Sequence, residues 1–263
     1  MSVLVTGARG FVGARVMAAM DGAVPAPSLQ GLTEDDIQRI VDMAAPDVIL
    51  HTAAISDIPT CEKNPEASYH ANVEIPLWLA RTGVKLVAFS TDQVYSGCAS
   101  EGPYMEELVE PGNLYAKHKL EMERRTLDRS PDTVLLRATW MYDMPMYGVV
   151  NRGNFLVNML RERELAFSST QQRAVTYVRI AAEQLRKAVL LPGGAYNFGS
   201  ENDLTMLETA RWLRHELTLP VTLSDSGERH NLWMDCAKAK ALGIDFGSTL
   251  DGLRRCISDY ALR

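Results

Sequence analysis

The chain has 263 residues, of which 46% are hydrophobic types and 23% are charged, and its formal net charge at pH 7 is −6. This length and composition are typical of a globular protein with enough chain to bury a core, and they exclude a fibre and an intrinsically disordered chain. A negative net charge provides no overall positive field, so we expect neither nucleic acid nor an anionic membrane as a partner.

The cellular compartment follows from the N-terminus and the cysteines. The opening segment MSVLVTG has neither the basic head nor the long apolar run of a signal peptide, and no window of the sequence has the length of a membrane-spanning apolar helix. The four cysteines are far apart and form no C-x-x-C pair, which is typical of a reducing compartment. We therefore expect a cytoplasmic protein. The five scattered histidines have no metal-ligand spacing, so no metal site is expected.

Short apolar runs alternate with amphipathic stretches in the first half of the chain, which is typical of strand–helix–strand units in a parallel sheet. The predicted strands span residues 3–6, 23–26, 47–51, 85–90 and 133–137. The predicted helices span residues 11–20, 34–44, 66–80 and 115–127. Thr33 is placed to cap the second helix. Runs such as VILH are apolar on both faces, so helices should cover both faces of the sheet. The fold class predicted is α/β, with a Rossmann-type, doubly wound parallel sheet.

The regular alternation ends after Arg137. Further on, the patterns predict helices at residues 154–163, 177–190 and 206–216, two short C-terminal helices, and a strand at 195–198. No Ser/Gly-rich or Pro-rich linker separates the halves, so we expect them to pack together around a cleft. We assign residues 1–140, completed by 177–198, to the Rossmann domain. Residues 141–263 form mainly a smaller α/β substrate domain.

The segment TGARGFVG directly follows the first predicted strand and opens the first helix. Gly7 allows a tight turn, Gly10 lets the backbone approach a pyrophosphate, and Gly13 lets the helix pack closely on the strand. Free N–H groups at the helix start then face the anion, with the helix dipole behind them. The alternative is a simple strand-to-helix turn, but its place in a parallel sheet favours dinucleotide binding. The cofactor-binding residues expected here are Gly7, Arg9, Gly10, Phe11, Val12 and Gly13.

Tyr115 and Lys119 form a Tyr-x-x-x-Lys pair on one face of a predicted helix. Thr91 precedes the tyrosine by 24 residues, at the end of the fourth strand. A free tyrosine titrates near pH 10, so the nearby ammonium of Lys119 would favour the phenolate. The position of the pair after the fourth strand resembles the active site of the short-chain dehydrogenase/reductase family. This resemblance implies that Tyr115 donates its proton to a substrate carbonyl oxygen as hydride reaches the carbon, and that Thr91 hydrogen-bonds the same oxygen. The alternative is a half-buried helix tyrosine beside an unrelated surface lysine.

The T-G-x-x-G-x-x-G loop and the Tyr-x-x-x-Lys pair together resemble the extended short-chain dehydrogenase/reductase family over nearly the whole chain. Within it, the best match is the dTDP-4-dehydrorhamnose reductase group, because NLYAKHKLEMER, LLRATWMY, RGNFLVNML and RHNLWMDCAKAKALGI resemble its segments in order. The resemblance implies that Lys119 also holds the nicotinamide ribose. It further implies that the small residues Thr52, Ala53 and Ala54 lie against the cofactor.

The same resemblance implies roles outside the catalytic set. Asn72 matches a position that braces the active-site backbone, and Asp92 and Trp140 should border the sugar. Trp140 has an equally weighted interpretation as an interdomain packing residue, and His51 is interpreted as a core histidine. Independently of the resemblance, arginines of the second half are candidates to meet the diphosphate, with a solvated side chain as the alternative for each: Arg152, Arg173 and Arg229.

The choice of dinucleotide depends on the second strand and the glycine loop. The segment APSLQG offers no acidic residue for the ribose hydroxyls of NAD. Arg9 lies in the loop instead, where its guanidinium would clamp a 2′-phosphate, as in similar NADP-using relatives. We therefore expect NADP, with NAD and a solvated Arg9 as the alternative.

The leading functional hypothesis is an NADPH-dependent oxidoreductase that reduces the 4-keto group of a nucleotide-diphosphate sugar. STDQVYSG also resembles a motif of 4,6-dehydratases, but Gln93 stands where they have glutamate, and a carboxamide accepts no proton at neutral pH. Two alternatives stay open: a nucleotide-sugar 4-epimerase, and a non-catalytic, dinucleotide-binding regulatory subunit. Gln93 and Gly31 depart from the reductase pattern, which leaves the sugar unspecified. The expected partners are the nucleotide sugar and, as an open question, a second copy of the chain in a homodimer.

Overall fold

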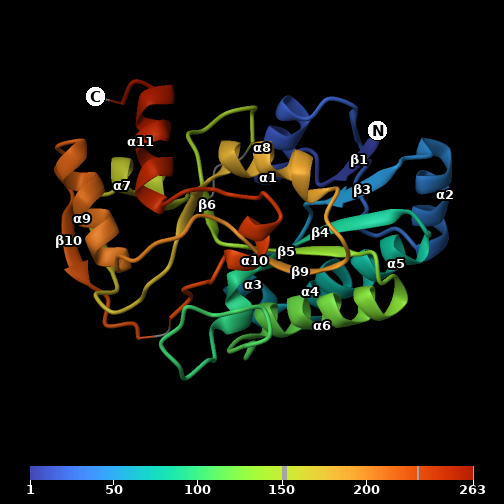
Figure 1. Ribbon diagram of the computed structural model, residues 1–263, viewed down its shortest axis with the longest axis horizontal. Coiled ribbons are helices and arrows are strands. Elements are labelled where there is room, and N and C mark those ends of the chain that lie inside the picture. Colours follow the sequence, from blue (N-terminus) through green and yellow to red (C-terminus); the bar gives the residue numbers. More distant parts are fainter. Residues whose placement is uncertain (150–152, 230, 263) are drawn as a thin grey trace.

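The computed structural model describes residues 1–149, 153–229 and 231–262. Its centre is a six-stranded sheet in the order β2-β1-β3-β4-β5-β9, and every neighbouring pair is parallel (Figure 1). The strands are β1 Val3–Thr6, β2 Ala23–Pro25, β3 Val48–His51, β4 Lys85–Thr91, β5 Val134–Ala138 and β9 Gly194–Phe198. The doubly wound parallel sheet predicted from the sequence is therefore confirmed.

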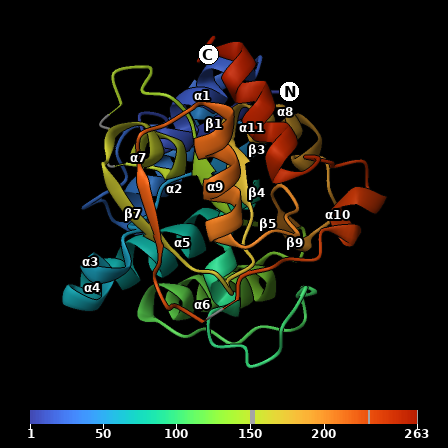
Figure 2. The ribbon, with the colours of Figure 1, turned by 90° about the vertical axis from the view of Figure 1, so that its left-hand side faces the viewer.

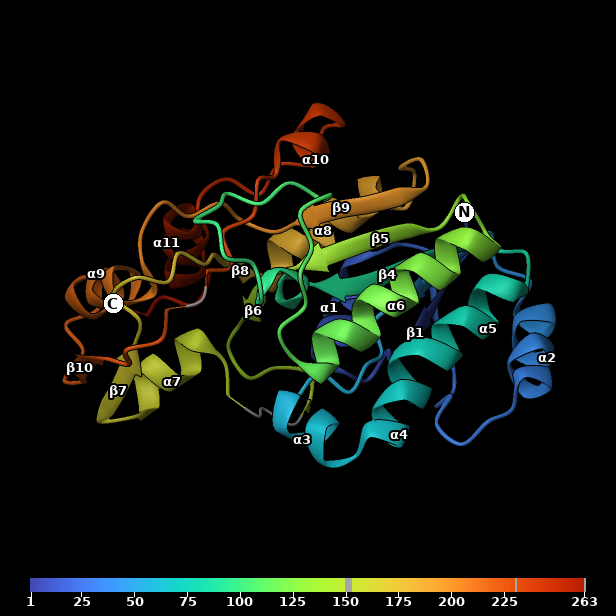
Figure 3. The same ribbon diagram turned by 90° about the horizontal axis from the view of Figure 1, so that it is seen from below.

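Helices cover both faces of this sheet, because side chains of alternate strand residues point to opposite faces. In β1, Val3 and Val5 belong to one apolar core and Leu4 belongs to another. The first core includes side chains of α1 (Phe11–Ala19) and α8 (Val178–Ala188), which pack on each other. The second core includes side chains of three helices on the opposite face (Figure 3). These are α2 Glu34–Ala44, α5 Ile75–Arg81 and α6 Leu114–Arg129.

The helix predicted at residues 66–80 is confirmed as one continuous helical segment, residues 65–81, and a short helix, α3 (Ile58–Lys63), precedes it. The segment consists of α4 (Pro65–Tyr69), a π-helical turn at His70–Glu74, and α5. The π-helical turn was not predicted. Pro76 has no N–H to donate to the carbonyl four residues earlier, and its ring would clash with that carbonyl in a regular α-helix. By contrast, α2 begins as predicted, with Thr33 and Asp36 in a reciprocal capping box.

The rest of the chain forms a smaller body at the end of the molecule farthest from α2 (Figures 1 and 2). It contains two parallel strand pairs that the sequence analysis did not predict: β6 Trp140–Tyr142 with β8 Val175–Tyr177, and β7 Glu164–Phe167 with β10 Thr222–Asp225. Its helices are α7 Phe155–Arg161, α9 Met206–Glu216 and α11 Thr249–Asp259, whereas α10 Ala237–Ala241 packs against β9 of the main sheet. No helix of the described residues is long and apolar enough to cross a membrane.

A buried ion pair joins α1 to the start of the smaller body. Arg15 Nε donates to Asp143 Oδ2 over 2.6 Å, and both side chains are almost fully buried. Tyr260, just after α11, donates to the other oxygen of Asp143 over 2.7 Å. Asp143 therefore connects the N-terminal helix, the chain after β6 and the C-terminal helix.

The Asp143→Ala variant should lose about 3–5 kcal/mol of unfolding free energy, because it leaves the Arg15 guanidinium buried without its partner. Urea unfolding followed by circular dichroism measures this loss. Asp251→Ala is the matched control, since its ion pair with Arg254 is exposed and such pairs are worth about 0–1 kcal/mol. Although Asp251 also caps α11, the loss in the control should be clearly smaller. Equal losses in the two variants would contradict a stabilising role of the buried pair.

Candidate active site

The glycine loop between β1 and α1 is built as tightly as the sequence predicts. Gly7 has φ of 69°, in the left-handed region that favours glycine, and Gly10 N donates to Gly7 O over 2.8 Å. A Cβ on Gly13 would lie 2.1 Å from Gly7 O, and a Cβ on Gly7 would lie 2.8 Å from Ala53 N. Side chains at Gly7 and Gly13 are therefore excluded by neighbouring backbone.

The first turn of α1 fits an anion. Gly10 is the N-cap residue and makes no side-chain cap hydrogen bond, and the first turn carries no acidic residue. Its N–H groups, including those of Phe11 and Val12, have no capping side chain and carry the positive end of the helix dipole. Arg9 is exposed beside this turn. Its contact with a 2′-phosphate remains a prediction.

A second short turn lies beside the glycine loop, at the carboxyl end of β3. Thr52 Oγ1 donates to Thr6 O over 2.8 Å, which ties the turn to the end of β1. Thr52 and Ala53 are half-buried and Ala54 is exposed. Asn72, fully buried in the π-helical turn, donates to Ile55 O over 2.9 Å and so braces the backbone that follows Ala54. This agrees with the bracing role expected of Asn72.

Thr91 and Tyr115 meet between the end of β4 and the first turn of α6. Asn113 caps this helix by accepting from Ala116 N over 2.9 Å, which fixes where the tyrosine turn begins. Both Thr91 and Tyr115 are buried. Burial raises the pKa of the Tyr115 phenol well above its usual value, and a hydrogen bond with the Thr91 hydroxyl opposes that shift. The phenol is therefore protonated at neutral pH, as a proton donor must be.

Lys119 lies one helical turn after Tyr115 and is only 1% exposed. Burial lowers its pKa to about 8, while the charge of Glu123 acts in the opposite direction. Among the described residues, the Lys119 ammonium has no hydrogen-bond partner. A buried group with three N–H donors requires acceptors, and the hydroxyls of a nicotinamide ribose would supply them. Together with the glycine loop, this orphaned ammonium shows that the residues present fit a dinucleotide.

His51, at the end of β3, is buried and hydrogen-bonded through Nδ1 to Thr6 Oγ1 over 2.7 Å. Burial and, to a lesser extent, the charge of Lys119 lower its pKa to about 3. The ring is therefore neutral at physiological pH. This agrees with the interpretation of His51 as a core histidine.

Sequence reasoning missed a buried network beneath the catalytic pair. Arg137 of β5 donates to both oxygens of Glu123 in α6, with Nη2 at 2.6 Å from Oε2. Ser90, the residue before Thr91, donates to the same carboxylate over 2.5 Å. The network joins α6, β4 and β5. A glutamate one turn after Lys119 was the only sequence signal for it.

Asp92 and Trp140, expected to border the sugar, meet through an arginine. Asp92 Oδ2 accepts from Arg173 Nε over 2.8 Å, and Oδ1 accepts from Arg173 Nη2 over 3.2 Å. The guanidinium carbon lies 5.7 Å from the ring centre of Trp140, which packs edge-on against Phe155. Arg173 was predicted to meet a diphosphate, and that contact stays a prediction. In the structure, the buried carboxylate of Asp92 pairs with the Nε–Nη2 edge of the guanidinium.

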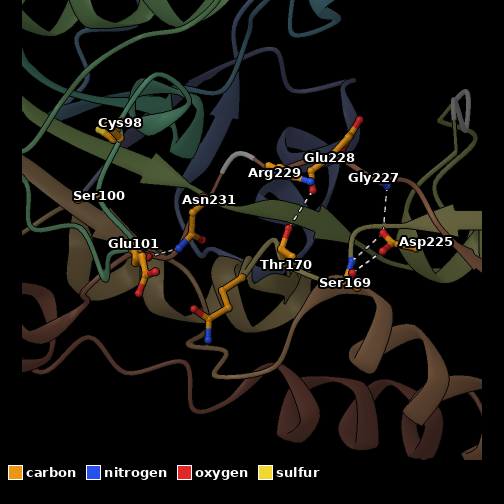
Figure 4. Close-up of a pocket in the computed structure, with 12 residues that line it drawn as sticks. Cys98, Ser100, Glu101, Ser169, Thr170, Asp225, Gly227, Glu228, Arg229 and Asn231 are labelled. Atoms are coloured by element: carbon orange, nitrogen blue, oxygen red, sulfur yellow. Dashed lines mark hydrogen bonds between the residues drawn. The ribbon is translucent and has the colours of Figure 1, made fainter.

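Arg229 lines a pocket of about 620 Å³ between the loop at residues 98–101 and the smaller body (Figure 4). Three hydrogen bonds join residues that line this pocket to one another. Ser169 donates to Asp225, Thr170 donates to Glu228 O, and Asn231 donates to Glu101 O. The pocket is lined by Cys98, Ala99, Ser100, Glu101, Ser169, Thr170, Gln172, Asp225, Gly227, Glu228, Arg229 and Asn231. None of the three catalytic candidates is among these residues, although Gln172 directly precedes the arginine that binds Asp92. Arg152, also predicted to meet the diphosphate, lies outside the described residues.

Comparisons with known proteins agree with this architecture. The family described as "RmlD substrate binding domain" matches residues 1–226. A dTDP-4-dehydrorhamnose reductase of Burkholderia thailandensis is 33% identical over 204 residues, which cover 70% of this chain and 64% of that protein. The chain thus spans less than two thirds of that relative. Methionine adenosyltransferase 2 subunit beta of Danio rerio is 28% identical over 241 residues, which cover 83% of this chain and 73% of that protein.

Among solved structures, dTDP-4-dehydrorhamnose reductase of Bacillus anthracis, in complex with NADP, superposes with a TM-score of 0.84. The match covers 98% of this chain and 100% of that chain at 22% sequence identity. At this identity the likeness establishes the fold.

Gly13→Ala should weaken NADPH binding at least tenfold or destabilise the fold, because its Cβ would force α1 away from the carbonyl of Gly7; such overpacking costs about 1–3 kcal/mol. Fluorescence titration with NADPH and thermal unfolding measure the two effects. Ala18→Ser, at an exposed position of the same helix, is the control. Wild-type affinity and stability in Gly13→Ala would refute the close approach.

NADPH affinity should fall by up to tenfold per pH unit above about pH 8, because Lys119 loses its proton there and with it the charge-assisted hydrogen bonds to the ribose. Titrations between about pH 6.5 and 9.5 measure this slope. Lys119→Arg should flatten it, since a guanidinium stays protonated. Lys117→Arg, at an exposed position of the same helix, should retain it. If Lys119→Arg keeps the wild-type slope, deprotonation of Lys119 is not the cause of the pH dependence of NADPH affinity.

Proposed function

Because the chain belongs to the family with the RmlD substrate binding domain, we propose that it is an NADPH-dependent reductase of a 4-keto group on a nucleotide-diphosphate sugar. One observation carries this proposal: Thr91 and Tyr115 meet, Lys119 follows one helical turn later, all three are buried, and the Lys119 ammonium has no partner among the described residues. A protein that only folded around this core would have no reason to bury that ammonium without acceptors.

The proposed chemistry divides between the bound cofactor and the chain. NADPH supplies the hydride when it is bound. Tyr115 donates its proton to the carbonyl oxygen of the sugar, and Thr91 orients that oxygen through a hydrogen bond. Lys119 holds the ribose and, by its charge, makes the phenol a stronger acid in the loaded site.

The cofactor preference rests on two features of this chain. Arg9 is exposed beside the first turn of α1, where a guanidinium can pair with a 2′-phosphate in two hydrogen bonds. The segment after β2 offers no carboxylate for the ribose hydroxyls of NAD. Both features support NADP, and a comparison of NADPH and NADH affinities tests this choice. A preference for NADH in the wild type would count against it.

The substrate would extend from Tyr115 past Trp140 towards the pocket that contains Arg229. A volume of about 620 Å³ suits part of a nucleotide sugar, since ligand pockets span about 300–1,000 Å³. Arg229 would supply a positive charge for the diphosphate. Cytoplasmic location and a homodimer stay predictions, and sedimentation of the purified chain tests the second.

The direct assay mixes the protein with NADPH and a dTDP-4-keto-6-deoxysugar and follows the absorbance of the reduced cofactor. We expect stoichiometric oxidation of NADPH and formation of the 4-hydroxy sugar. A 4-epimerase would instead interconvert nucleotide sugars without net consumption of NADPH. Failure with several keto-sugars, with cofactor binding established, would contradict the proposal.

One observation favours a second candidate, a regulatory subunit that binds a dinucleotide without turnover. The match to the methionine adenosyltransferase subunit covers 83% of the chain, more than the match to the reductase of Burkholderia thailandensis. The buried set of Thr91, Tyr115 and Lys119 argues for the enzyme, because a module that only binds a dinucleotide does not need a buried phenol hydrogen-bonded to a threonine.

Tyr115→Phe should lower turnover by about 10²–10⁴-fold, the usual contribution of a positioned acid, while NADPH affinity changes less than about threefold. Steady-state kinetics and fluorescence titration measure the two quantities. Tyr69→Phe is the matched control, because its hydroxyl contacts Glu121 on the outer side of α6 and should leave turnover unchanged. If Tyr115→Phe turns over as fast as the wild type, Tyr115 is not the proton donor.

A further inference from the structure

We propose that Arg173 is a positioning residue of the active site: its ionic clamp on Asp92 fixes the carboxylate beside Tyr115. This inference deepens the proposed function and rests on it, since the clamp matters to the reduction only if Tyr115 is the proton donor.

The geometry of the clamp leaves Asp92 little freedom. Asp92 is 1% exposed and Arg173 is 18% exposed, so the pair lies at the inner wall of the site. Two parallel hydrogen bonds from one guanidinium to one carboxylate form the strongest common arrangement of an ion pair. The pair joins residues 81 positions apart, one just after β4 and one just before β8. A carboxylate buried to this extent without its partner would be strongly unfavourable.

Arg173 is itself held in place from two other sides. Its backbone carbonyl accepts from Asn202 Nδ2 over 2.9 Å, and the same buried amide donates to Thr209 of α9 over 3.0 Å. Its guanidinium also faces the ring of Trp140 at 5.7 Å, where a cation is attracted by the π-electrons. The wall formed by Asp92, Arg173 and Trp140 is thus preorganised.

The clamp connects to the catalytic phenol through charge and through Thr91. Thr91 Oγ1 donates to Asp92 Oδ1 over 3.4 Å and is the hydroxyl that hydrogen-bonds Tyr115. Two charged groups act on the phenol: the carboxylate of Asp92, which raises its pKa, and the guanidinium of Arg173, which lowers it. The thiol of Cys61 is a titratable neighbour that would raise the same pKa if it ionised, but burial raises its own pKa and keeps it neutral. Lys119 follows one turn later. Loss of Arg173 would leave the charge of Asp92 uncompensated beside the group that must give up a proton.

The proposal makes a prediction that a diphosphate-binding Arg173 does not. Arg173→Gln should lower kcat about 10–100-fold with less than a threefold change in KM for the nucleotide sugar. In the alcohol-oxidation direction with NADP⁺, activity rises with pH as Tyr115 loses its proton. This rising limb of kcat against pH should move to higher pH in Arg173→Gln, because the uncompensated charge of Asp92 raises the pKa of Tyr115. Adding Asp92→Asn removes the uncompensated charge, so the double variant should recover at least tenfold in kcat and return the limb towards its wild-type position.

A stability cycle tests the clamp independently of turnover. Urea unfolding of the wild type, Asp92→Asn, Arg173→Gln and the double variant should show a coupling of at least tenfold in the unfolding constant. The matched control cycle uses Glu183→Gln and Arg255→Gln, an equally forked but exposed pair, and should show little coupling and unchanged kcat. If the wild type turns over no keto-sugar, the proposed function fails, while this cycle still decides whether the clamp exists.

The outcomes separate the alternatives. A raised KM with unchanged kcat in Arg173→Gln, without rescue by Asp92→Asn, would make Arg173 a substrate ligand and overturn the proposal. Additive effects of Arg173→Gln and Asp92→Asn on both kcat and the unfolding free energy would also overturn the proposal. If Arg173→Gln does not fold, a folded double variant supports the clamp. If neither variant folds, Arg173→Lys decides: a loss in kcat supports the positioning role, and a loss confined to KM refutes it.

Discussion

The ion pair between Glu123 and Arg137 is the interaction on which the arrangement of the candidate site depends. It fixes α6, which carries Tyr115 and Lys119, against β4 and β5. Because Ser90 donates to the same carboxylate, the strand residue next to Thr91 is tied to the helix one turn beyond Lys119. The ion pair thereby fixes the Thr91 hydroxyl of the sheet relative to Tyr115 and Lys119 of the helix.

The electrostatics of the site follow from burial. The Tyr115 phenol is kept protonated, the pKa of Lys119 is lowered to about 8, and His51 is kept neutral. These shifts suit a protein that binds an anionic dinucleotide and transfers a proton close to it. The first turn of α1 offers backbone N–H groups without a capping side chain or an acidic residue, so a diphosphate could be held there despite the overall negative charge of the chain.

Local signals predicted the elements that carry the cofactor and the catalytic pair. Apolar runs covered on both faces indicated the strands, and glycine spacing indicated the turn at Gly7 and the close packing at Gly13. Features that depend on tertiary contacts could not be predicted in this way. The clamp between Asp92 and Arg173 joins segments 81 residues apart, and the short strands β6 and β8 are defined by each other rather than by a pattern of their own. Hydrophobic periodicity did not predict the π-helical turn either. That turn follows from Pro76, which cannot donate a hydrogen bond to the carbonyl four residues earlier and would clash with it in a regular α-helix.

The central claim is that Lys119 and the glycine loop hold one dinucleotide whose nicotinamide faces Tyr115. A crystal structure of the protein with NADP⁺ tests this most directly. The account predicts that the Lys119 ammonium hydrogen-bonds the ribose next to the nicotinamide and that N–H groups of the first turn of α1 contact the diphosphate. A nicotinamide bound away from Tyr115, or a Lys119 ammonium that stays without a ribose contact, would contradict it.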